Sequence, residues 1–144
     1  MFRARSYNAS MKNRSLILLV TLAIVSIAAG PSNFAGEYAD RNFLNGQATF
    51  QMSLEQSGNT VSIWFSAGYN DGHSIQPVAD GSGKITSKGT VELTFTDSAR
   101  NAGTGTITRA GDDIIVSLKT NRVADSRCVE LYRQNMRLKK VGKK

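Results

Sequence analysis

Alternation of apolar and polar residues with a period of two is the feature that most limits how this chain can fold. In the stretch 48–56, Phe50, Met52 and Leu54 occupy every second position and are separated by polar residues. The same alternation recurs at 61–66, 83–86, 91–96, 103–108 and 114–118, and a last strand is expected from Val129 to Leu138. Short alternating runs bounded by Gly, Asn and Asp are typical of an antiparallel meander. We therefore predict an all-β fold.

Each expected strand is apolar on one face only, and this restricts how the strands assemble. One face carries Val, Ile, Leu and Phe, whereas the other carries Thr, Ser and scattered charges. A sheet with one apolar face has to cover that face with itself. Closure into a barrel does this and also removes exposed strand edges. We predict an up-and-down meander closed into a small barrel of about 7–9 strands, with a β-sandwich as the alternative.

The first 28 residues have the layout of a cleavable secretory signal. Lys12 and Arg14 precede an uncharged run at 16–28, in which Ser26 and Ala28 supply the small residues of a cleavage site. A bilayer-spanning helix needs about 20 apolar residues, so the run is short for an uncleaved anchor, which is the alternative. We predict an exported protein of the bacterial periplasm or extracellular space.

The chain beyond the signal is long enough for one domain. We assign residues 1–28 to the signal peptide, within which 1–10 can be an over-extended start, and residues 29–138 to a single β-barrel domain. Residues 139–144 form a basic C-terminal tail. Because few apolar groups follow Leu138, we expect the tail to be disordered.

The formal net charge of +7 comes from the two ends of the chain. The segment Ala29–Met136 contains 9 basic and 11 acidic residues, whereas the last eight residues contain five cations. A nucleic-acid-binding protein carries its positive charge on a folded face, so no nucleic-acid partner is predicted. The basic tail predicts weak, salt-sensitive contact with an anionic membrane or a cell-wall polymer.

The start of the expected domain resembles a known family. The sequence Asn-Phe-Ala-Gly-Glu-Tyr at 33–38 is similar to the Gly-x-aromatic opening of the calycins, the lipocalin-like barrels. This resemblance implies a small barrel in which an Arg of the final strand packs over the aromatic ring, here Tyr38. Arg133 and Arg137 are the candidates for that Arg.

Residue types that carry catalysis are scarce. His73 is the single histidine and Cys128 the single cysteine, so a Ser-His-Asp arrangement would have to use His73 with Asp71. Zinc sites draw three or four ligands mainly from His and Cys, and this chain has only one residue of each type. We predict no enzymatic activity, no metal and no cofactor. Alternation with Val129 and Leu131 places Cys128 on the opposite face of the last strand, which favours an accessible thiol.

Three features suggest binding. Trp64 lies on the polar side of its strand, where it either contacts a glycan or protein or is covered by a neighbouring segment. The polar stretch 67–83 contains Tyr69 and His73 and is expected to be a long loop, although 74–78 can form one more short strand. The connection 96–101 contains Arg100 and can line the same end of a barrel.

Two functions from different classes follow from these features. The first is a non-enzymatic exported binding protein, lipocalin-like, which holds a small apolar ligand inside the barrel or a partner at its loop end. The second is a secreted inhibitor or adhesion-type module that binds a protein through Trp64 and the 67–83 loop. The predicted ligand- or partner-binding residues are Trp64, Tyr69, His73 and Arg100.

Overall fold

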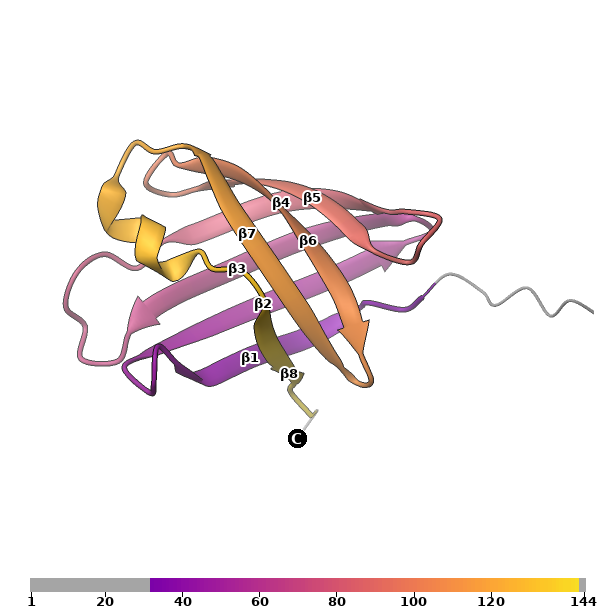
Figure 1. Cartoon of the computed structure of the whole chain (residues 1–144), viewed down its shortest axis with the longest axis horizontal. Helices are drawn as coiled ribbons and strands as arrows, with labels where there is room; N and C mark the ends of the chain where they lie inside the picture. The colour runs from indigo at the N-terminus through magenta and orange to yellow at the C-terminus, as the bar shows by residue number, and fades with distance from the viewer. Residues whose placement is uncertain (1–31, 143–144) are drawn as a thin grey trace, which may run out of the picture.

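Eight antiparallel strands follow one another around a closed barrel in residues 32–142, the part of the chain that the computed structural model describes. The strands are β1 (Gly36–Phe43), β2 (Ala48–Ser57), β3 (Thr60–Tyr69), β4 (Val78–Ile85), β5 (Val91–Asp97), β6 (Ala102–Ala110), β7 (Asp113–Arg122) and β8 (Met136–Lys140). Each strand pairs with the next, and β8 pairs with β1. The predicted all-β meander and its closure are confirmed (Figure 1). The predicted signal peptide, 1–28, lies outside the described residues.

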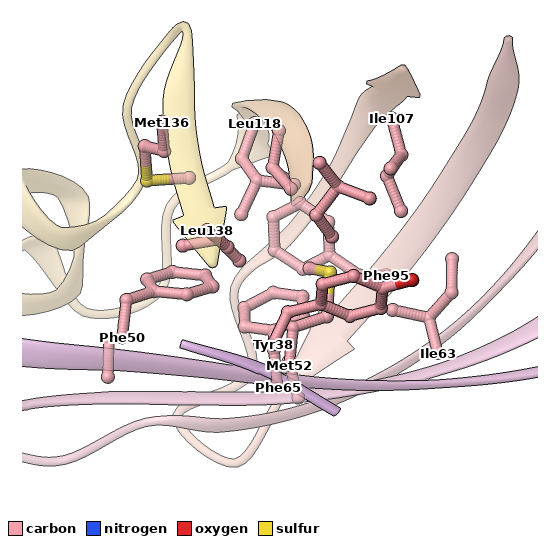
Figure 2. Packing of buried hydrophobic residues seen from close by; sticks show 14 of the residues in the cluster. Tyr38, Phe50, Met52, Ile63, Phe65, Phe95, Ile107, Leu118, Met136 and Leu138 are labelled. Carbon is pink, nitrogen blue, oxygen red and sulfur yellow. The ribbon is translucent and has the colours of Figure 1, made fainter. Parts of the chain in front are cut away.

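Large side chains fill the interior of the barrel. The rings of Phe50 and Phe65 stack with centroids 5.4 Å apart, and Phe95 meets Phe65 edge-on at 5.2 Å. Figure 2 shows these rings with Met52 and Leu138 converging on the same space. Each of these five side chains is buried. The apolar face that the alternation predicts is therefore the packed core of the barrel.

Glycines on β4 and β6 allow the barrel wall to curve tightly. A Cβ atom at Gly103 would lie 2.2 Å from the carbonyl oxygen of Lys119 and 2.6 Å from the ring of Phe95. A Cβ atom at Gly81 would lie 2.5 Å from the carbonyl oxygen of Thr94. Neighbouring backbone and core side chains already occupy the space, so no side chain fits at either position.

The stretch 67–83 is mostly strand, so its prediction as a long loop is wrong. β3 continues to Tyr69 and β4 begins at Val78, which leaves a connection at 70–77. The buried residues Ala67 and Ala79 extend the inward alternation of the two strands. Small inward residues explain the error, because Ala and Gly do not produce the apolar pattern by which a strand is recognised.

The segment expected to begin the last strand forms a short 3-10 helix instead. This helix spans Ser126–Leu131, and Asp125 caps it by accepting a hydrogen bond from the backbone N–H of Arg127. Cys128 and Leu131 are buried one helical turn apart, whereas Val129 is exposed. The expectation of an accessible Cys128 is therefore wrong, since its thiol faces the core.

The last strand begins later and ends later than predicted. β8 spans Met136–Lys140, so it includes two residues that were assigned to the tail. The backbone N–H of Lys140 donates to the carboxylate of Asp113 at 3.1 Å, and that of Val141 donates to the carbonyl oxygen of Glu37 at 2.8 Å. These bonds, together with pairing to β1, hold the first part of the predicted tail on the barrel. Residues 143–144 lie outside the described part of the chain.

The opening motif is held by an arginine from an unexpected strand. The Tyr38 hydroxyl donates to the carbonyl oxygen of Phe34 at 2.8 Å. Arg109 of β6 reaches the Tyr38 oxygen at 3.4 Å and donates to the carbonyl oxygen of Asn33 at 2.7 Å. The resemblance implied Arg133 or Arg137 at this place. Their side chains bond elsewhere, to the carbonyl oxygen of Glu130 and to the carboxylate of Asp113 respectively.

Connections of two kinds lie at opposite ends of the barrel. The connections 44–47, 70–77, 98–101 and 123–135 lie at one end, which we call the loop end. Figure 1 shows the 3-10 helix in yellow at this end, beside the β3–β4 connection. The short turns between β2 and β3, β4 and β5, and β6 and β7 lie at the other end, with both ends of the described chain.

Candidate functional site

Trp64 stands on the outer face of β3, as the alternation predicts. Its side chain is 39% exposed, whereas Ile63 and Phe65 on either side are buried. Its cross-strand neighbours are Ser53 on β2 and Asp80 on β4. Within residues 32–142, Trp64 is left exposed at the surface, although more than half of its area is covered by its surroundings.

Polar groups and one further apolar residue surround Trp64. Val78, which is 38% exposed, lies opposite Ser66 and two residues along β4 from Asp80, the cross-strand neighbour of Trp64. Ser53 donates to the Glu37 carboxylate at 2.6 Å and thereby orders the β1–β2 side of this surface. We call the outward surface formed by Ser53, Trp64, Val78 and Asp80 the Trp64 face. It combines an exposed aromatic ring with hydroxyl and carboxylate groups.

Tyr69 and His73 lie together at the loop end. Their rings stack with centroids 4.1 Å apart, and the His73 ring nitrogen Nδ1 contacts the Asp71 carboxylate. Tyr69 donates its hydroxyl to Glu130 at 2.9 Å, which ties the end of β3 to the 3-10 helix. This hydrogen bond raises the pKa of Tyr69, and the backbone N–H of His73 lowers the pKa of Asp71.

The four predicted binding residues do not form one site. Trp64 and Tyr69 are five positions apart on β3 and therefore face opposite sides of the strand. Arg100 belongs to the loop end, where it has a positive φ of 66° and its carbonyl oxygen accepts a hydrogen bond from Arg122 at 3.4 Å. The structure thus brings Tyr69 and His73 into contact and places Trp64 on the barrel wall.

A buried polar network fixes the loop end and was not predicted. The Asp97 carboxylate accepts hydrogen bonds from the Tyr132 hydroxyl at 2.6 Å and from the Asn101 amide at 2.9 Å. Asn101 in turn accepts from the backbone N–H groups of Ala124 and Asp125 at 2.7 and 2.8 Å. Burial, together with the bond to Asp97, raises the pKa of Tyr132. The network anchors the 123–135 segment over the barrel end.

Two surface grooves were also missed by sequence reasoning. A groove of about 490 Å³ lies between the β1–β2 turn and the segment 130–137, and Tyr69, Glu130 and Arg133 line it. Another, of about 620 Å³, lies on the outer faces of β4 to β7, where Thr and Ser hydroxyls alternate with Lys84, Glu92 and Lys119. Their lining residues come from strands and turns far apart in the sequence, so a local pattern does not reveal them.

Within residues 32–142, His, Cys, Asp and Glu side chains nowhere gather in a group of three that could hold a metal ion. None of the helices in that range is long and apolar enough to cross a membrane.

Comparison with known proteins finds no matching family model, no similar curated protein and no similar solved structure. The resemblance of the opening motif to the calycins therefore stays a prediction.

Proposed function

We propose that this chain is a non-enzymatic exported binding protein that takes its partner on the outer surface of the barrel, at the Trp64 face. The observation that carries the proposal is the exposure of Trp64, 39%, on a strand whose alternate residues are buried. Export follows from the predicted signal at 1–28 and belongs to the same proposal.

The packing of the barrel favours an outer site over an inner one. Phe50, Phe65 and Phe95 are each at most 3% exposed and contact one another across the interior. An apolar ligand inside the barrel would have to displace such rings from a close-packed core. A partner on the outside requires no such rearrangement.

The Trp64 face has the composition of a small contact surface. Tryptophan is among the residues that contribute most to binding energy at protein interfaces, because its large rigid ring loses little entropy when it is covered. Val78 adds apolar area beside the ring, and Ser53 and Asp80 offer hydrogen bonds at its border. The partner that fits this chemistry is a protein or glycan surface with both apolar and hydroxyl groups.

Trp64→Ala should abolish capture of a partner from an envelope extract and leave the thermal midpoint nearly unchanged. Because Trp64 is the only tryptophan of the chain, the captured fraction should also shift the tryptophan emission of the wild-type protein to shorter wavelength. The control is Glu92→Ala, an exposed position on the outer face of β5, which should capture normally. A large loss of stability in Trp64→Ala would show that the ring is structural, and emission unchanged on capture would place the partner elsewhere.

A further inference from the structure

The seam between β1 and β8 is closed at one end and open at the other. Both strands lie wholly within the described residues, and they pair through Tyr38–Ala39 and Lys139–Lys140. Beyond Ala39, β1 makes no further pair with β8 among the described residues, and its register with β2 becomes irregular between Asp40 and Phe43. The two strands therefore separate toward the loop end, and a trench forms between them.

Two adjoining grooves occupy this trench. The first is the groove of about 490 Å³ that contains Tyr69, and the second, of about 430 Å³, runs beside Lys139. Both are lined by Asp40, Asn42 and Arg137, so they are continuous. We call the combined trench the seam groove. Along β8 alone, five residues at about 3.3 Å each give it a length of roughly 16 Å.

Positive charge dominates the seam groove. Its cationic side chains are Arg41, Arg133, Arg137, Lys139 and Lys140. Its carboxylates are Asp40 and Glu130, and Asp113 beside the groove is paired with Arg137, which leaves a formal charge of +2. Both carboxylates already accept hydrogen bonds, Asp40 from the backbone N–H of Asn42 at 2.9 Å and Glu130 from the Tyr69 hydroxyl.

The cations face outward in a fixed arrangement. On β8, Met136 and Leu138 are buried, so Arg137 and Lys139 lie on the outer face. Asp113 holds the Arg137 guanidinium at 3.1 Å. Ala39 is the register partner of Lys139, and the exposed Arg41 lines the same groove as these two residues. Among the described residues neither Arg41 nor Lys139 forms an ion pair.

We propose that the seam groove binds a linear polyanion through its repeating phosphate groups. Guanidinium groups present paired N–H donors that match the oxygens of phosphate, and the lysines add point charges beside them. An elongated trench with cations along its length suits a chain of such groups better than a single ion. This site lies on β1 and β8 and is independent of the Trp64 face.

Other anionic partners fit the groove less well. Nucleic acids add base stacking on aromatic rings, but the partly exposed aromatic ring of this groove, Tyr69, is already stacked on His73. Membrane-surface elements present several apolar side chains beside their cations, whereas the exposed large apolar residue among the described lining of this groove is Val141.

The test measures binding of end-labelled inorganic polyphosphate to the full chain by fluorescence anisotropy across a series of salt concentrations. Arg41→Gln and Lys139→Gln should each lower the affinity several-fold, and each should reduce the slope of log affinity against log salt by about one. Lys84→Gln and Lys119→Gln remove the same charge from the outer faces of β4 and β7, and should change neither quantity appreciably. Arg41 and Lys139 are exposed and form no ion pair within residues 32–142, so equal thermal midpoints are expected for all four variants.

Three outcomes would overturn the proposal. Equal weakening by the control substitutions would show general charge attraction without a site. Tighter binding to phosphatidylglycerol vesicles, single-stranded DNA or polygalacturonate than to polyphosphate would show that the occupant has been assigned wrongly. Absence of polyphosphate binding at low salt in the folded wild-type chain would exclude the site. None of these results affects the Trp64 face, whose test uses other residues and another readout.

Discussion

At the scale of single residues, the inward positions of the barrel show how little freedom the packing leaves. β5 directs Leu93 and Phe95 inward, and the strands on either side direct glycines toward them. The Phe95 ring occupies the space that a side chain at Gly103 would need. The large residue therefore packs only because the residue opposite it is small. The identity of the small residue is therefore determined by a neighbour on another strand.

Gly103→Ala should destabilise the protein by about 3 kcal/mol, because overpacking of a well-filled core forces the backbone to shift. The added methyl group would meet the Lys119 carbonyl oxygen at 2.2 Å, an atom of a paired strand that cannot rotate away. Urea unfolding followed by circular dichroism measures the change. Gly142→Ala is the matched control, since within the described residues no atom beyond its chain neighbours lies within 4 Å of its added Cβ, and it should unfold as the wild type does. Similar midpoints for both variants would contradict this account of Gly103.

At the scale of elements, the 3-10 helix depends on a charged cap. Asp125 accepts hydrogen bonds from the side chain and the backbone N–H of Arg127, and these lower the pKa of its carboxyl group from 3.8 to about 2. A folded-state pKa below the unfolded value means that the contribution to stability is complete above about pH 4. It is lost as the pH falls from there toward 2.

Asp125→Asn should remove this part of the acid sensitivity of the protein. We expect the wild type to lose more unfolding free energy than the variant between pH 5 and pH 2.5. Chemical denaturation at the two pH values gives the difference, and titration of the carboxyl carbon by NMR reports the pKa directly. An Asp125 carboxyl that titrates near its ordinary value would refute the cap as described. Glu55→Gln, at an exposed outer position on β2, should keep the acid sensitivity of the wild type.

At the scale of the whole molecule, closure of the barrel rests on its last residues. β8 is the shortest strand among those described and is the one that joins β7 to β1. Asp113 supports this closure twice, through the backbone N–H of Lys140 and the guanidinium of Arg137. The first of these contacts is the main cause of the lowered pKa of Asp113.

A chain that ends at Leu138 should be less stable than the wild type by on the order of 2 kcal/mol, since it loses the backbone hydrogen bonds of Lys140 and Val141. A chain that ends at Gly142 retains both bonds and should match the wild type. Hydrogen exchange supplies a second measurement, in which the amides of Lys140 and Val141 should be protected in the intact protein. Rapid exchange of these amides, or equal stability of the two truncations, would restore the view that the tail starts after Leu138.

The sequence alone determined the fold class and most of the wall of the barrel. Period-two alternation is a local property, and each stretch such as 48–56 or 91–96 can bury one side in only one way. For the same reason the outward position of Trp64 followed from its neighbours Ile63 and Phe65. The number of strands, eight, also agrees with the predicted number of about 7–9.

The tertiary structure alone decided the features that depend on distant partners. β4 is a strand although Gly81 and Gly83 erase its pattern, because β3 and β5 pair with it on both sides. The segment 126–131 is helical because Cys128 and Leu131 reach the core at a spacing that no strand provides. Lys139 and Lys140 belong to a strand because Asp113 and β1 supply acceptors that lie far away in the sequence. Local periodicity does not depend on such contacts and cannot predict them. The seam groove is lined by β1 and β8, which meet only when the barrel closes, so it could not be predicted from the sequence.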